Sequence, residues 1–369
     1  MDPFESILLP TDLLPSSREA AAVAVRLARR FGSRLTLLRV FEPQPDVPVD
    51  LREAFQREAD PLRGLVGEIA GQGVQVGEAA VAVGPVVDTI LHKAQEVGAG
   101  LILMGAGDPP PGGRFAVGPV AQAVLEHAPQ PVLAVRPGGL PAGPRKVLCA
   151  VDHSPASLRA LRIAARLTQA VEGDLTVLTV VPAVPWLSAA VETGELADAA
   201  AAHDRRWREA FEEALRAVDF GPARWAKEVR HGAPHGGILA AAREGGADVL
   251  VMGATGRSGL ARVLLGSVTR RVLRDLPCSL LTVKDEGGDP GRLEEDVRAT
   301  LVLMAQGRGL LEAQSYPAAV AKFRRALLHN PFHIPAMDGL AVALHHLGRA
   351  SEAEFYRWRA KVLRGYAAD

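Results

Sequence analysis

The chain has 369 residues, which is too long for one ordinary domain and predicts roughly two or three. Its 42 basic and 42 acidic residues leave no net charge, so the composition argues against nucleic acid or a membrane surface as a partner. Cys149 and Cys278 cannot form a disulfide framework, and no signal peptide or run of about eighteen apolar residues is found, so we expect a cytoplasmic protein.

Strands and helices are predicted to alternate over residues 1–137, because short apolar runs are separated by stretches with apolar residues at helical spacing. This alternation predicts a parallel sheet with helices on both faces. In chain order the predicted elements are strand 6–10, helix 16–31, strand 34–41, helix 49–70, strand 74–83, helix 85–97, strand 101–105, helix 119–127 and strand 132–136.

The same order then repeats over residues 144–285, after a linker rich in proline and glycine. A repeat of about 140 residues marks two copies of one domain. The predicted elements of this copy are strand 146–152, helix 155–170, strand 175–181, helix 196–217, strand 225–231, helix 234–244, strand 249–253, helix 267–274 and strand 279–283.

Residues 292–369 are predicted to form an all-helical tail. Its residues from Gly307 to Pro331 fall at spacings that resemble a tetratricopeptide repeat, and a weaker match follows. About two repeats are too few for an independent solenoid. The tail is therefore expected to pack on the α/β domains, on a second chain or on a protein partner, and a bundle that covers only its own core remains an alternative. The predicted helices are 293–311, 317–329, 334–347 and 351–367.

The segment GATGRSGLARVLLGS carries the most chemical information, because it follows an apolar strand and opens a helix. Gly253 and Gly256 allow the chain to turn sharply and a phosphate to approach the main chain. Gly266 and Ser267 lie at the helix N-terminus, where N–H groups and the helix dipole favour an anion. The Ser267 hydroxyl is expected to cap the helix and to donate to a phosphate, with Arg257 as a counter-charge. Turn formation alone is the alternative for such glycines.

The run VLVMGATGRSGLARVLLGSVTRRVLRDLPCSLLTV resembles the C-terminal half of a universal stress protein of the ATP-binding subclass, whose signature is G-x-x-G, nine residues, then G-S or G-T. The run KVLCAVDHSPASLRALRIAARLTQ resembles the first strand and helix of that family. The resemblance covers residues 144–285 and, in general pattern, residues 1–137. It implies two tandem open parallel five-stranded sheets, of the adenine-nucleotide alpha-hydrolase-like type with strand order 3-2-1-4-5. It also implies ATP, with Mg²⁺ or Mn²⁺, across the carboxyl ends of the strands.

The resemblance also implies roles for individual residues of the second copy. Asp152 would lie near the ribose or the phosphates, and a turn or helix-cap role is an equally open interpretation of this residue. The other implied positions are Val180 or Val181 for the adenine edge, Met252 and Gly253 under the ribose, and Gly256, Gly266, Ser267 and Val268 around the phosphates.

The first copy departs from this pattern in its corresponding run, GAGDPPPGGRFAVGP. Asp108 stands where the second copy has Gly256, and a carboxylate repels phosphate. Pro119 stands where the second copy has Ser267, which removes an N–H donor and a hydroxyl. We therefore expect a degenerate nucleotide site, with a remodelled site for another ligand as the alternative.

No catalytic constellation is found, since neither GxSxG nor a GxGxxG after a first strand occurs. At most, slow ATP hydrolysis is expected. We predict an ATP-binding stress-response sensor or adaptor whose nucleotide state modulates partner binding. The alternative is a protein-interaction scaffold that acts through residues 292–369 and holds a structural nucleotide.

The last strand of each copy is short and apolar, and an unpaired edge of this kind favours pairing with another strand. Residues 132–136 and 279–283 are therefore expected to pair within the chain as an internal pseudo-dimer. Association of two chains into a homodimer is left open by the sequence.

Overall fold

The computed structural model describes residues 2–43, 51–108, 117–138, 146–182, 197–254, 265–284, 290–329, 333–350, 352–354, 356–357 and 360–361. These residues divide into two compact units. The first comprises Met1–Val40, Gln56–Val81 and Ile90–Glu286, and the second comprises Phe41–Phe55, Ala82–Thr89 and Gly287–Asp369.

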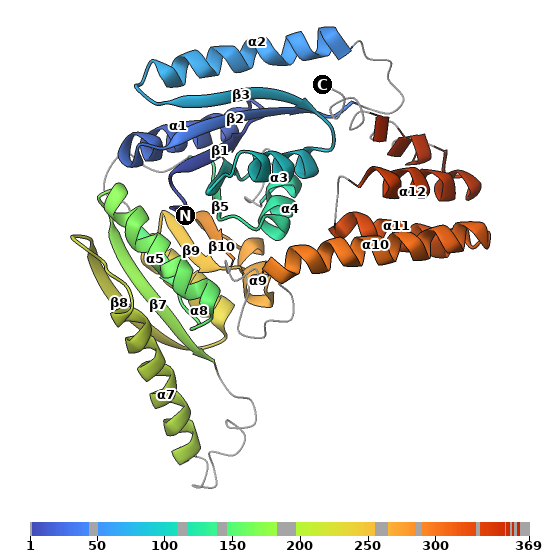
Figure 1. The fold of residues 1–369 in the computed structure, drawn as a ribbon. Coiled ribbons are helices and arrows are strands. Elements are labelled where there is room, and N and C mark those ends of the chain that lie inside the picture. The colour runs from blue at the N-terminus through green and yellow to red at the C-terminus, as the bar shows by residue number, and fades with distance from the viewer. Residues whose placement is uncertain are drawn as a thin grey trace. The chain divides into compact units, whose positions relative to one another are not determined.

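One ten-stranded sheet carries both α/β domains (Figure 1), with the order β3-β2-β1-β4-β5-β10-β9-β6-β7-β8. The central strands are buried along their length because helices cover both faces, and this explains their continuous apolar runs. The strands are β1 (Ser6–Pro10), β2 (Arg34–Phe41), β3 (Val76–Val83), β4 (Leu101–Gly105), β5 (Val132–Val135), β6 (Lys146–Ala150), β7 (Asp174–Pro182), β8 (Arg224–Gly232), β9 (Val249–Gly253) and β10 (Ser279–Val283).

The prediction of two separate five-stranded sheets is wrong, because the two halves join into one sheet. Each half keeps the predicted 3-2-1-4-5 order, and β5 pairs antiparallel with β10 through the register Leu133↔Leu281. The physical reason is that each last strand has an open edge of N–H and C=O groups, and antiparallel pairing satisfies both edges at once. The two domains thus pair through their last strands, as the edge-strand argument predicts.

The helices of the α/β domains begin with a shared signal. Proline occupies the first helical position of α1, α4, α5 and α8, where its fixed φ suits the helix and its missing N–H is not needed. Their ends lie within three residues of the predicted bounds. The helices are α1 (Pro15–Phe31), α2 (Leu51–Ala70), α3 (Val86–Glu96), α4 (Pro119–His127), α5 (Pro155–Ala170), α7 (Ala197–Arg216), α8 (Pro234–Glu244) and α9 (Ser267–Arg274).

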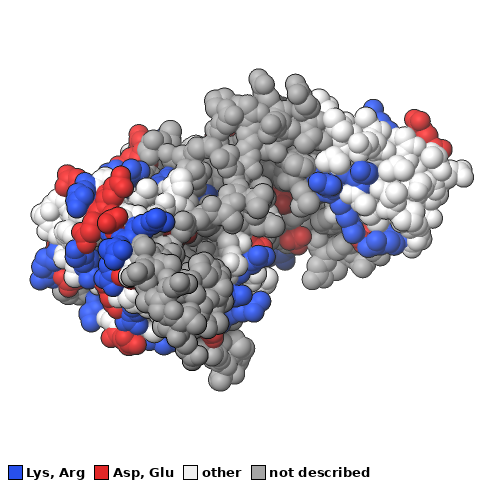
Figure 2. Space-filling view, turned by 90° about the horizontal axis from the view of Figure 1, so that it is seen from below, with Lys and Arg blue, Asp and Glu red and all other residues white. Residues whose placement is uncertain are grey.

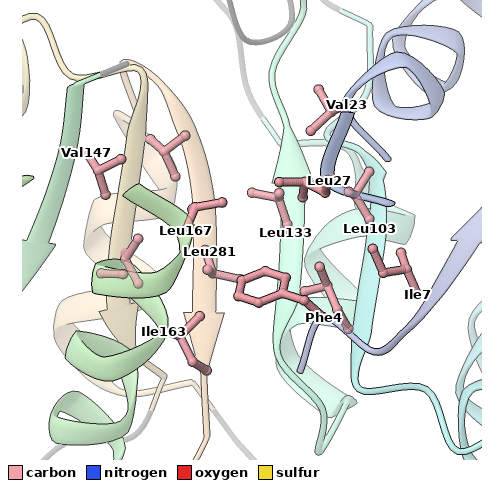
Figure 3. Close-up of a cluster of buried hydrophobic side chains, with 14 of the residues drawn as sticks. Phe4, Ile7, Val23, Leu27, Leu103, Leu133, Val147, Ile163, Leu167 and Leu281 are labelled. Carbon is pink, nitrogen blue, oxygen red and sulfur yellow. The ribbon is translucent and has the colours of Figure 1, made fainter. Parts of the chain in front are cut away.

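A single buried apolar layer runs under α1, α2, α5 and α7 and contains residues of both domains (Figure 3). The ring of Phe4 stacks on Phe31 with centroids 4.2 Å apart and belongs to the same cluster as Leu281 of the other domain. At the edge of this layer Arg166 of α5 forms an ion pair with Asp2 and lies over the Phe31 ring. The junction between the two domains is therefore a packed core rather than a linker.

The second unit contains the helical tail, with α10 (Pro290–Glu312), α11 (Tyr316–His329) and α12 (Ile334–His346). Phe323 is fully buried where these helices meet. A Cβ atom added at Gly307 or Gly339 would lie only 2.6 or 2.5 Å from its ring, so both glycines are required for this packing. The fourth predicted helix, 351–367, lies mostly outside the described residues.

Two features of the described residues bear on contact with a membrane. On the face seen in Figure 2, basic and acidic side chains are interspersed rather than gathered by sign. Within the described ranges, no helix has both the length and the apolar character needed to cross a bilayer.

Candidate functional site

Those predicted site residues of the second domain that the structure describes lie at the carboxyl edge of the sheet. β6 pairs in parallel with both β7 and β9, so the three strands end at the same edge. Asp152 follows β6 by two residues, and Met252 of β9 lies beside Ala150 of β6. Gly253 is the last residue of β9. From β6 the chain continues to β7 on one side, and from β9 it continues to β10 on the other side. Ligands bind at such a point of divergence in open α/β sheets.

Asp152 forms the turn that starts α5. Its Oδ1 accepts hydrogen bonds from the backbone N–H and the hydroxyl of Ser154, at 3.1 and 2.5 Å. The Ser154 Oγ in turn accepts from the backbone N–H of Ser157 at 3.2 Å and caps the helix. The turn role considered for Asp152 is therefore present, and both of these bonds use one carboxylate oxygen.

Val180 and Val181 lie on the part of β7 that extends beyond the end of β6. β7 pairs with β8 as far as Pro182↔Gly232, whereas its pairing with β6 ends at Ala150↔Leu178. The side chains of both valines are buried. Any ligand at this position would therefore be read by main-chain groups, as the resemblance implies.

Gly253 has a packing reason that needs no ligand. A Cβ atom at this position would lie 2.9 Å from the backbone nitrogen of Ser157, so only glycine lets α5 approach β9 this closely. The first domain repeats the contact, since a Cβ at Gly105 would lie 2.6 Å from the Ser16 hydroxyl. The glycine is thus explained by helix packing in both domains.

The segment after β9 is anchored at both ends by backbone hydrogen bonds. Ala254 N–H donates to Val283 O and Gly266 N–H donates to Ala254 O, both at 2.7 Å. Gly256 and Arg257 lie between these anchors, outside the described residues.

The prediction that Ser267 caps α9 is wrong. Gly266 is the cap residue, with extended backbone angles φ −58° and ψ 156°, and no side chain caps this helix. Ser267 is the first helical residue, because the cap position needs non-helical angles and Gly266 adopts them. The exposed Ser267 hydroxyl and the half-buried Val268 stand in the first turn, whose N–H groups have no acceptor within the helix.

The equivalent loop of the first domain is anchored by the same two backbone hydrogen bonds, but its residues differ. Ala106 N–H donates to Val135 O at 2.8 Å and Gly118 N–H donates to Ala106 O at 2.7 Å. The first helical residue of α4 is Pro119, so this position has neither an N–H group nor a hydroxyl. Asp108 is exposed just after the first anchor.

A pair that the sequence analysis missed lies beside the site. The Thr179 hydroxyl donates to Val151 O at 2.9 Å and accepts from the indole N–H of Trp207 at 2.8 Å. Trp207 belongs to α7, and its ring also meets the ring of His153 with centroids 4.9 Å apart. No motif marks these residues, and helical spacing alone does not reveal that Trp207 reaches the end of β7.

Charged side chains line the next position along the edge. His231 of β8 lies beside Val181 in the register and contacts Asp204 of α7 at 2.7 Å. Asp204 also pairs with Arg208 at 2.6 Å. Hydrogen bonds from Arg208 and then from His231 lower the pKa of the Asp204 carboxyl, so it stays ionised at neutral pH.

The cysteines take no part in this chemistry. Cys149 and Cys278 are both free and buried. Burial raises the pKa of the Cys278 thiol to about 12 and raises that of Cys149 further, so neither forms a thiolate at neutral pH. Across the described part of the chain, no group of three or more His, Cys, Asp or Glu residues could hold a metal ion.

Comparison with known proteins gives consistent matches. The profile of the universal stress protein family matches residues 3–136 and 143–284. The "universal stress protein in QAH/OAS sulfhydrylase 3′ region" of Thermus aquaticus is 34% identical over 136 residues, which is 36% of this chain and 99% of that protein. A universal stress protein of Methanocaldococcus jannaschii is 31% identical over 145 residues, or 38% of this chain and 82% of that protein.

A solved structure covers both domains together. The crystal structure of a universal stress protein from Archaeoglobus fulgidus DSM 4304 superposes with a TM-score of 0.58 at 21% identity. The match covers 77% of this chain and all of that chain. At this identity the likeness shows a shared fold.

Proposed function

The chain belongs to the universal stress protein family, and from this premise we propose that its second domain, residues 144–285, binds ATP. The bound nucleotide would control the affinity of this stress-response protein for a partner. The observation that carries the proposal is a difference between the equivalent loops of the two domains. The loop anchors of the two domains are alike, but only the second domain offers the N–H and the hydroxyl of Ser267 to an anion, where the first has Pro119.

In this proposal the main chain of Val180 and Val181 reads the adenine edge, and Met252 and Gly253 lie under the ribose. Asp152 contacts the ribose or the phosphates. The phosphates lie against Gly256, Gly266, Ser267 and Val268, with Arg257 as a counter-charge.

A divalent cation fits this arrangement only as part of the nucleotide complex. Mg²⁺ bound with a triphosphate typically takes one or two carboxylates and fills its other positions with phosphate oxygens and water. Asp152 supplies one carboxylate at the edge where the phosphates would lie. We propose that Mg²⁺ or Mn²⁺ arrives with ATP, and that it neutralises part of the phosphate charge.

The test is calorimetric titration of the full chain with Mg-ATP beside two variants. Gly256→Asp copies the carboxylate of the first domain, and Gly112→Asp adds the same charge to the corresponding loop of the first domain as a control. We expect one ATP per chain, lost in Gly256→Asp and kept in Gly112→Asp. Two ATP per chain would show that the first domain also binds, and no binding by the wild type would overturn the proposal.

The alternative, a scaffold that acts through the tail, is favoured by one observation. The side chain of Leu301 on α10 is 59% exposed, and Val302 beside it is also exposed, which is unusual for a pair of large apolar residues. Partner binding that survives Gly256→Asp but is lost in Leu301→Asp would favour the scaffold. Partner binding that depends on ATP would favour the nucleotide-controlled adaptor.

Location and assembly complete the proposal. We place the protein in the cytoplasm, where two free buried thiols are stable without oxidation. The joined sheet already pairs the last strand of each domain, so a homodimer would use a different surface. Light scattering of the full chain with and without ATP measures that state directly.

A further inference from the structure

We propose that Trp207 and Thr179 are positioning residues that shape the base-binding half of the nucleotide site. The inference rests on the proposed ATP binding by the second domain and names which residues fix the adenine end of it. Neither residue belongs to the family signature quoted above, and neither is proposed to touch the phosphates.

Thr179 lies where the pairing between β6 and β7 ends. It is the first residue of β7 beyond Leu178, the last residue paired with β6, and it immediately precedes Val180. Its hydroxyl donates to Val151 O, one residue before Asp152. One buried side chain thus ties together the two strand ends proposed to hold the nucleoside.

Trp207 of α7 contacts Thr179 from the neighbouring helix. Its indole N–H donates to Thr179, and only 7% of the residue is exposed. The ring meets His153 edge-on at 70°, directly after Asp152 in the chain. His153 holds φ at +66°, as Leu13 does at the equivalent position of the first domain, so this conformation belongs to the turn that both copies share.

Trp207 therefore contacts sequence neighbours of Val180 and Asp152, two of the residues proposed for the nucleoside. It reaches Val180 through Thr179, and it reaches Asp152 through His153 and through Val151. The phosphate half depends on other contacts, since α9 is anchored to Ala254 and Gly253. A change at Trp207 is expected to disturb the base half and to spare the phosphate half.

The first domain fills the same position with charge. Arg39 is the first residue of β2 beyond the pair Pro10↔Leu38, and its side chain meets Glu58 of α2 at 2.7 Å. This ion pair is only partly exposed, so the position equivalent to Thr179 carries a paired charge in the first domain. The neutral Trp207–Thr179 pair suits a nearby site for a planar uncharged base such as adenine. The Arg39–Glu58 ion pair instead places charged groups beside the corresponding edge of the first domain.

The experiment measures the two halves of the ligand separately. Trp207→Phe is compared with Trp225→Phe, which is the same substitution in a tryptophan that is 42% exposed and pairs with Leu175 at the amino end of the sheet. The probes are Mg-ATP, adenosine and inorganic tripolyphosphate, each measured by calorimetry or by displacement of a fluorescent ATP analogue.

We expect Trp207→Phe to weaken ATP and adenosine binding by about five- to tenfold, the size of one lost hydrogen bond, and to change tripolyphosphate binding less than about twofold. Trp225→Phe should change none of the three. An equal loss for all three ligands would mean a merely structural role, and unchanged adenosine affinity would overturn the inference. Failure of the wild type to bind any adenine ligand would instead overturn the proposed function on which it rests.

A second variant places an ion pair at this contact. Thr179→Arg with Trp207→Glu provides both of its members, and a cooperative thermal transition establishes that the variant is folded. Adenosine binding should fall below detection while tripolyphosphate still binds. Adenosine binding retained by this folded double variant would contradict a role for the pair in shaping the base site.

Discussion

The two α/β domains share one sheet and one path of the chain, yet they differ at the sheet edge where a ligand would bind. Some local features occur in both copies. Asp12 and Asp152 each accept a backbone N–H two residues ahead, at 3.0 and 3.1 Å, and Leu13 and His153 both hold φ at +66°. Features kept in both copies, including the glycines that end β4 and β9, are therefore explained by folding alone.

Other features occur in one copy only, and these separate the two edges chemically. Ser267 faces solvent where the first domain has Pro119, and Trp207 bonds to a threonine where the first domain has an ion pair. The comparison teaches that a duplicated domain keeps the residues that its fold needs and can lose those that only a ligand needs. Four sets of substitutions test this contrast.

Ser267→Pro should have the largest effect, because it copies the first domain at the start of α9. Proline is tolerated at the first helical position and the preceding Gly266 is already extended, so the melting temperature should change little. The lost N–H and hydroxyl should weaken ATP binding by at least tenfold, since hydrogen bonds to charged groups contribute about 1.5–3 kcal/mol each. Calorimetry checks the affinity. The reciprocal Pro119→Ser should gain no ATP binding while Asp108 remains.

Gly105→Ala and Gly253→Ala test the shared part of the comparison. Each added Cβ would collide with the N-terminal turn of the following helix, α1 or α5, so each variant should lose about 2 kcal/mol of unfolding free energy. Urea unfolding monitored by circular dichroism measures both. Unchanged stability in Gly253→Ala would contradict the packing role of this glycine.

The two strand ends at the junction should respond differently to pH. Burial lowers the pKa of Lys284, just after β10, from 10.5 to about 8, although the nearby Glu126 opposes this shift. The unfolded chain therefore binds more protons between about pH 8 and 10.5, and this lysine makes stability rise with pH by about 1 kcal/mol per unit in that window. Below it, the cost of burying the charge is fully present.

Lys284→Met should lack this rise. The unfolding free energy of the wild type minus that of the variant should therefore increase with pH across the window. Arg136→Met, at the equivalent end of β5, is the control, because arginine stays charged throughout the window. Parallel pH profiles for the wild type and Lys284→Met would contradict the assignment to Lys284.

Helix capping should give the smallest difference. Ser154 caps α5, whereas Leu14 is 53% exposed at the equivalent position of α1 and makes no side-chain cap. Ser154→Ala should cost about 1 kcal/mol, and Leu14→Ser should add about 0.5 kcal/mol. Thermal unfolding detects both changes, and a stabilised Ser154→Ala would show that the cap is not needed.

The order of elements and the duplication could be predicted from local patterns, such as apolar runs and helical spacing, which depend on residues close together in the chain. The strand order within each half and the family were predicted from the resemblance of the motifs to those of universal stress proteins. It also located the contrast between Ser267 and Pro119, because that contrast occupies one position of a repeated motif.

The pairing of β5 with β10 was predicted from their apolar edges, but its antiparallel register and the surroundings of the site edge required the tertiary structure. The contact of Trp207 with Thr179 joins residues 28 positions apart, and Gly253 needs its small size because α5 lies against it. Each depends on which surfaces the fold brings within bonding distance, and no pattern along the chain records that.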